Sequence, residues 1–135
     1  YEAPTICHHR LDAKLNRLYY SPGWVIDHPA RDVAEWIRTQ ILDDDMNMET
    51  IANFIGEYNE LLPLKRSGYG VIYSRLLFPS AFFDAVDRLF TNERVEVDWV
   101  DDVYRLVGKV GTEEDFLTRF SESYMTGLPK IEWLK

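Results

Sequence analysis

The sequence has a single cysteine, Cys7, so no disulfide can form within the chain. It contains no apolar run that approaches the roughly 20 residues of a transmembrane helix, and no signal-peptide pattern opens it. These absences argue against a disulfide-stapled secreted domain and against a membrane-spanning protein. A lone thiol fits a reducing compartment, and we expect no membrane partner.

Positive charge is also scarce. The chain has 15 Lys and Arg against 23 Asp and Glu, which gives a net charge of −8. The cations are spread along the sequence, whereas a protein that binds a phosphate backbone needs a basic face. We therefore expect no nucleic-acid partner, and the acidity mainly favours solubility.

Apolar side chains are abundant: 46% of the 135 residues are hydrophobic and 14% are aromatic. A chain of this length suits one domain, and it buries about two-thirds of the surface that its unfolded form exposes. We expect residues 1–135 to form a single domain with a well-filled core that needs no metal or disulfide to fold.

Helical spacing of apolar residues recurs along most of the chain. The first helix is expected to open at Asp27, which would cap it, with Pro29 in the first turn. It should end near residue 42, because an acidic run follows that opposes the C-terminal end of the helix dipole. The second helix is expected between an Asn47 cap and Pro63.

Later segments carry similar signals. Ser80 is expected to cap a helix whose Phe83 and Phe90 face inward. A further apolar stripe covers residues 99–110. Thr112 is expected to open the last helix through a sequence that resembles a capping box, and Gly127 to end it.

Short segments break this helical pattern. Residues 65–70 read as a turn, and the lone G-x-G at Gly68 to Gly70 lacks the context of a phosphate-binding loop. Residues 23–26 and 95–97 have strand-like composition. The fold class that we expect is mainly α, with at most a small β-hairpin near the N-terminus.

The densest polar run is Cys7 to Asp12, followed closely by Asn16. One interpretation is a metal site, but consecutive side chains rarely converge on one ion and no second Cys pair exists. Another is a Cys/His nucleophile, which needs a separate base and an orienting group. The third is the relic of a phosphotransferase loop, in which His, Asp and Asn follow one another at short spacing.

Two blocks carry a resemblance to a known family: Ile6 to Leu11 (ICHHRL) and Trp24 to Ile37 (WVIDHPARDVAEWI), with shorter matches at Tyr73 to Ser80 and Ile131 to Leu134. Over nearly its whole length the chain resembles the C-terminal lobe of CotS/YutH-type spore coat proteins. These belong to the aminoglycoside phosphotransferase/choline kinase-like superfamily. The D-H-P-A-R-D block is the more specific, because related kinases carry D-x-P-x-R-D-L-A just after their metal-binding Asp. The resemblance implies a helical, kinase-like C-lobe.

The first kinase motif departs from that of active relatives, which read His-x-Asp-x-x-x-x-Asn. With His8 as the motif histidine, Arg10 stands where the catalytic Asp belongs, and an arginine cannot accept the substrate proton. A shifted frame makes Asp12 the base and Asn16 a metal ligand, but its spacing is also wrong. Neither frame yields the complete set.

The second motif is shortened. Asp27 stands alone where the family has two Asp residues, so we expect the metal-binding loop to be deleted and Asp27 to be structural. Arg31 and Asp32 correspond to scaffold residues of the superfamily. Arg75 is interpreted as a surface cation, and Asp43 to Asp45 as a solvated helix end.

The resemblance implies a structural component of the spore coat, assembled from the mother-cell cytoplasm, whose partners are other coat proteins. It would be a pseudokinase with no catalytic residues, no cofactor and no metal. The chain begins with Tyr and lacks a glycine-rich loop, so we expect it to be the C-lobe of a longer protein. The oligomeric state stays open.

The alternative is the C-lobe of an active small-molecule kinase that needs its N-lobe, ATP and Mg²⁺. In that case Asp12 would be the base, and Asn16 and Asp27 would hold the metal. A helical adaptor unrelated to either role is the third possibility.

Overall fold

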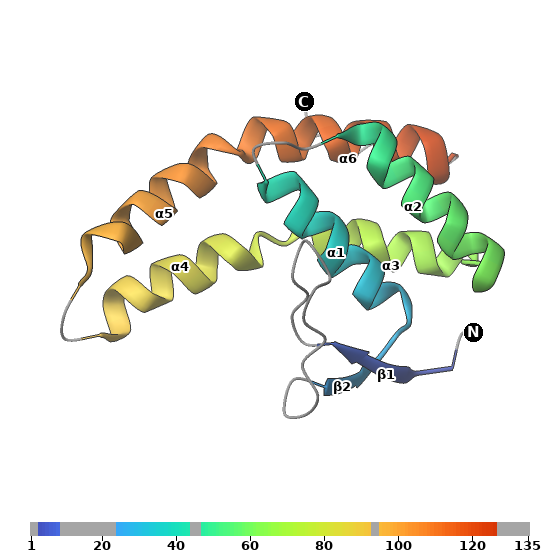
Figure 1. Ribbon diagram of the computed structural model, residues 1–135, viewed down its shortest axis with the longest axis horizontal. Helices are drawn as coiled ribbons and strands as arrows, with labels where there is room; N and C mark the ends of the chain where they lie inside the picture. The colour runs from blue at the N-terminus through green and yellow to red at the C-terminus, as the bar shows by residue number, and fades with distance from the viewer. Residues whose placement is uncertain (1–2, 9–23, 44–46, 93–94, 127–135) are drawn as a thin grey trace.

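The computed structural model describes residues 3–8, 24–43, 47–92 and 95–126. Two strands come first, β1 (Thr5–His8) and β2 (Trp24–Asp27). Helices follow in the order α1 (Ala30–Leu42), α2 (Met48–Leu61), α3 (Arg66–Leu77), α4 (Ser80–Thr91), α5 (Val97–Gly108) and α6 (Val110–Tyr124) (Figure 1). The prediction of a mainly α fold with a small N-terminal hairpin is confirmed.

The core lies in a bundle around α1, which packs against α3 and also contacts α2 and α6. Its largest fully buried side chains are aliphatic and come from the first three helices: Val33, Ile37, Ile41, Ile51, Ile55, Ile72 and Leu76. Phe116, Leu117 and Phe120 of α6 close the same cluster. This apolar layer fixes α1 and α3 side by side, and that arrangement positions the polar residues at their ends.

The hairpin of β1 and β2 lies beside the N-terminus of α1 (Figure 1). The strands are antiparallel, with Thr5 opposite Asp27 and Cys7 opposite Val25. Side chains alternate between the two faces of a strand; accordingly Cys7 is buried while Ile6 and Ile26 are exposed. The hairpin therefore places Asp27, its last residue, next to the first turn of α1.

Helices α4 and α5 form a second region, a hairpin-like arm that extends from the bundle (Figure 1). Ala85 and Leu106 are buried within it. Phe83 and Phe90 are 51% and 83% exposed, so the prediction that they face inward is wrong. Each helix of the arm packs mainly on the other, and one neighbour can cover only one strip of a helix.

Several predicted helix ends are confirmed. The Oδ1 atom of Asn47 accepts a hydrogen bond from the N–H of Glu49 at 2.9 Å, so Asn47 caps α2. Helix α2 ends at Leu61, before Pro63, and α1 ends at Leu42.

The predicted Asp27 cap is wrong, because α1 opens after Pro29 without a side-chain cap. Instead, the N–H of Ala30 donates to Nδ1 of His28 at 3.1 Å. Asp27 is the last residue of β2, and its carboxylate forms ion pairs with Arg31 and Arg75. Ser80 makes no capping hydrogen bond either, since it is already inside α4 and Pro79 precedes the helix.

Three other boundaries differ from the prediction. Residues 66–70 are the first turns of α3 and not a turn, and Val97 opens α5 and not a strand. Helix α6 begins at Val110, so Thr112 lies within its first turn. Two glycines in α3 cost about 1 kcal/mol each relative to Ala, and the buried residues Ile72 and Leu76 offset this by packing against the bundle. The predicted stop at Gly127 lies outside the described residues.

Candidate functional site

The carboxylate of Asp27 is the centre of the candidate site. Its Oδ1 atom accepts the N–H of His28 at 2.7 Å, and its Oδ2 atom accepts Nη1 of Arg31 at 2.7 Å. Oδ2 also accepts Nη2 of Arg75, which comes from the last turn of α3. Both oxygens are therefore engaged, and one side chain ties the end of β2 to two helices.

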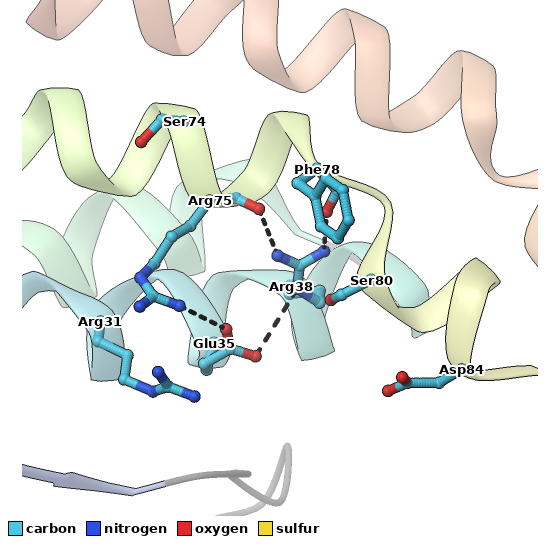
Figure 2. A pocket seen from close by; sticks show the side chains of 8 residues that line it. All are labelled: Arg31, Glu35, Arg38, Ser74, Arg75, Phe78, Ser80 and Asp84. Carbon is cyan, nitrogen blue, oxygen red and sulfur yellow. Dashed lines mark hydrogen bonds and ion pairs between the residues drawn. The ribbon is translucent and has the colours of Figure 1, made fainter. Parts of the chain in front are cut away.

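Glu35 continues this network along α1. Its Oε1 atom lies 3.8 Å from Nη1 of Arg75, and its Oε2 atom lies 3.7 Å from Nε of Arg38 (Figure 2). Arg31 and Glu35 are four residues apart, so they lie on the same face of the helix. The result is an alternation of arginines and carboxylates along the contact between α1 and α3.

Arg38 is buried, with 6% of its surface exposed. Its guanidinium donates through Nη1 to the carbonyl of Phe78 at 2.9 Å and through Nη2 to the carbonyl of Arg75 (Figure 2). These carbonyls belong to the C-terminal end of α3, where helix carbonyls lack intrahelical partners and a positive charge is favourable. Arg38 therefore caps α3 from the neighbouring helix.

A pocket of about 430 Å³ opens beside this network, between α1, the end of α3 and the start of α4 (Figure 2). Its lining includes three arginines and two carboxylates: Arg31, Arg38, Arg75, Glu35 and Asp84. Asp27, just outside the lining, binds two of these arginines. Each of the three arginines therefore already contacts a carboxylate, Asp27 or Glu35, which disfavours the pocket as a phosphate site.

The interactions of Asp27 also determine its ionisation. Burial alone would raise its pKa, but the hydrogen bond from Arg31, the N–H of His28 and the charge of Arg75 together lower the pKa below the ordinary value. Asp27 is ionised at neutral pH and held by its two arginines.

The Cys7 thiol behaves in the opposite way. Burial raises its pKa, and the negative charges of Asp32 and Asp27 raise it further. A nucleophilic cysteine needs a lowered pKa and an electropositive setting. The Cys7 thiol has the opposite setting, since its pKa is raised and its sulfur lies 3.4 Å from the carbonyl oxygen of His28, which disfavours a nucleophilic role.

The structure brings together only some of the predicted site residues. Asp27 and Arg31 are in contact, and Asp32 lies beside Arg31 in the first turn of α1. His8 pairs with Trp24 at the other end of the hairpin from Asp27, about 10 Å away along the strand. Arg10, Asp12 and Asn16 lie outside the described residues, so neither catalytic-loop frame is tested.

Glu35, Arg38 and Arg75 are site residues that the sequence prediction missed. The interpretation of Arg75 as a surface cation is wrong, because its side chain is 28% exposed and bonded to Asp27. A signal existed for Arg38, which lies in the same helical stripe as Ala34 and Ile41 and is therefore a charge at an apolar position. No local signal links Arg75 to Asp27, because 48 residues separate them.

Comparison with known sequences decides the family. The family described as "Spore coat putative kinase YutH" matches residues 1–120. The chain belongs to this YutH family. The endospore coat-associated protein YutH of Bacillus subtilis (strain 168) is 29% identical over 149 aligned residues. The alignment covers 98% of this chain but 42% of that relative, and no solved structure matches.

The YutH match confirms the predicted resemblance and its spore coat family. The description of the family includes a kinase, which implies Mg²⁺ bound through carboxylates. Within the described part of the chain, no three His, Cys, Asp or Glu side chains are grouped to hold a metal ion. Asp27, the described carboxylate that stands where the metal-binding Asp is expected, already binds two arginines, so it is not free to hold a magnesium ion in this arrangement. In the described part of the chain, no helix is long and apolar enough to cross a membrane.

Proposed function

We propose that this chain is a component of the spore coat that acts through protein contacts and does not transfer phosphate. One observation carries the proposal: the carboxylate of Asp27, which stands at the metal-binding motif, is bonded to Arg31 and Arg75. Membership of a spore coat family supports the location, and other coat proteins are the partners that such a location offers.

The proposal follows from what Mg²⁺ would require. To coordinate a metal, Asp27 would have to leave Arg31 and Arg75, and two guanidinium groups would then face each other without their shared anion. Hydrogen bonds to charged groups contribute about 1.5–3 kcal/mol each, with the lower end applying to a side chain that is 30% exposed. The network therefore favours a structural carboxylate over a metal ligand.

Thermal unfolding of the protein with Mg·ATP tests the enzymatic half of the proposal. We expect no change in stability on addition of millimolar Mg·ATP. A nucleotide present at a hundred times its Kd would add about 2.7 kcal/mol. A stabilisation of this order that is lost in Asp27→Asn would contradict the proposal and favour the kinase in which Asp12 and Asn16 act with Asp27.

Microscopy tests the location. A fluorescent fusion expressed during sporulation should form a shell around the developing spore. In the Mg·ATP melts, Asp98→Asn is the matched control for Asp27→Asn, because Asp98 is exposed on α5. A diffuse signal from the unmodified fusion would contradict a role in the coat.

A further inference from the structure

Helix α5 has two apolar strips. A helix that packs mainly on one neighbouring helix needs only one. The inner strip, which includes Leu106, packs within the arm. The outer strip consists of Val97, Val100, Tyr104 and Val107, which are 77%, 37%, 75% and 52% exposed. Their spacing of three, four and three residues is that of the contact strip between two packed helices. The outer strip therefore has the pattern of a helix interface but no partner within the described residues.

Helix α4 widens this apolar surface with Phe83 and Phe90, seven residues apart. At 100° per residue, Phe83 and Phe90 lie 160° and 140° ahead of the buried Ala85, and the outer strip of α5 lies 100–180° ahead of the buried Leu106. Because α4 and α5 are antiparallel (Figure 1), rotations of the same sense in the two helices turn both exposed strips toward the same side of the arm. We call this surface the outer face: Phe83, Phe90, Val97, Val100, Tyr104 and Val107.

Negative charge borders the outer face on both sides. Asp87 follows Phe83 around α4, and Asp101 follows Val97 around α5. The ion pairs formed by the described residues do not involve Asp87 or Asp101. The arginines of the arm are used elsewhere, since Arg88 and Arg105 both approach Asp102, at 3.8 and 3.5 Å.

The negative charge beside the outer face determines which kind of molecule can bind it. A second copy of the chain would place the same carboxylates against each other, and anionic lipids or nucleic acids would be repelled by them. A helix with one apolar strip and Lys or Arg on both of its flanks complements the surface. The outer strip of α5 spans 11 residues, or about 15 Å, which matches about three turns of a docked helix.

We propose that the outer face of the α4–α5 arm binds a basic amphipathic helix of a partner protein, in the manner of a helix laid into an apolar groove. This inference rests on the proposed function and deepens it, because it names the surface and the chemistry through which the protein contacts its partners.

A model peptide tests the proposal directly. The probe is a synthetic helix with Leu at the a and d positions of each heptad and Lys at e and g, and its binding is followed by fluorescence anisotropy. The matched peptide carries Glu in place of Lys. We expect the Lys peptide to bind the unmodified protein at least tenfold more tightly than the Glu peptide, with affinity that falls as salt rises. Equal affinity of the two peptides would overturn the proposal.

Variants separate the outer face from general attraction to an acidic protein. Tyr104→Ser combined with Val97→Ser should weaken binding at least tenfold, whereas Leu61→Ser removes an exposed apolar side chain of α2 and should not. Asp87→Asn with Asp101→Asn should weaken it severalfold, whereas Glu57→Gln with Asp115→Asn, which also removes two exposed charges, should have a smaller effect. Equal losses in test and control variants would overturn the proposal. All of the altered side chains are exposed, and circular dichroism checks that each variant folds.

Sedimentation tests the competing occupant. We expect the protein alone to show no self-association through this face. A concentration-dependent dimer that Tyr104→Ser abolishes would assign the outer face to a second copy and overturn the partner helix. Failure of the peptide test would leave the spore-shell signal and the Mg·ATP melts unchanged, so it is distinguishable from failure of the proposed function.

Discussion

The bundle and the arm are both built from amphipathic helices, yet they bury their apolar residues to very different degrees. In the bundle, Ile37 and Ile72 are fully buried because α1 is covered by several neighbours. In the arm, Phe83 and Phe90 remain exposed. Helical periodicity shows that a helix has an apolar face, but the number of neighbouring elements decides whether that face becomes core.

The largest contrast between the two regions should appear on truncation of apolar side chains. Ile37→Ala in the bundle should lower the free energy of unfolding by about 2–5 kcal/mol, because it leaves a cavity among close-packed neighbours. Phe90→Ala in the arm, at a position 83% exposed, should change it by less than about 0.5 kcal/mol. Urea unfolding measures both. Comparable losses would show that the arm is packed as tightly as the bundle.

The polar network at the end of the bundle should give the next largest effect. Asp27→Asn removes the shared anion of Arg31 and Arg75 and should lower the free energy of unfolding at pH 7 by about 1–2 kcal/mol. Asp98→Asn on the arm removes only an exposed first-turn charge of α5 and should cost less, about 0.5 kcal/mol or below. Equal effects of the two substitutions would mean that the network contributes nothing to stability.

This loss should depend on pH in a defined direction. The pKa of Asp27 is lowered in the folded protein from an ordinary value of 3.8, so its contribution to stability is present above that value. As the pH falls below 3.8 toward the folded pKa, the contribution is lost. The unfolding free energies of the unmodified protein and Asp27→Asn should therefore converge in acid. A difference that stays constant down to pH 3 would contradict the ion pairs.

Helix caps sharpen the comparison at a smaller scale. Asn47→Ala removes the hydrogen bond to the N–H of Glu49 and should destabilise the bundle by about 1 kcal/mol. Ser80→Ala in the arm should be nearly neutral, because Ser80 makes no capping bond. Thermal melts of the two variants check this. A larger loss of stability for Ser80→Ala than for Asn47→Ala would show that Ser80 does cap α4.

The smallest effect should come from Glu113 in the first turn of α6. Burial raises the pKa of Glu113 above the ordinary 4.5, although the charge of Arg38 opposes this. The folded state therefore disfavours the ionised form at neutral pH, and Glu113→Gln should increase stability there by less than about 1 kcal/mol. The gain should vanish below pH 4.5, where the unmodified side chain is protonated in both states. Its exposed neighbour Glu114 is the control, and a loss of stability in Glu113→Gln at pH 7 would contradict the account.

The same contrast explains what the sequence could predict. Family, mainly α class and the N-terminal hairpin follow from motifs and periodicity, and the Asn47 cap follows from chemistry within three residues. The failures need information from distant residues. Arg75 reaches Asp27 across 48 positions, and this single contact converts an expected helix cap into the centre of an ion-pair network. Phe83 carries a core-like pattern, and its exposure depends on which helices lie next to it.

The carboxylate of Asp27 is engaged by Arg31 and Arg75, and the proposed function depends on this carboxylate being unavailable to a metal ion. Carbon-13 NMR titration of the Asp27 carboxyl group, with and without millimolar Mg²⁺, tests it most directly. We expect a pKa below 3.8 that does not change when Mg²⁺ is added. A pKa at or above 3.8, or a further fall on addition of Mg²⁺, would show that the carboxylate is open to metal and would contradict the account.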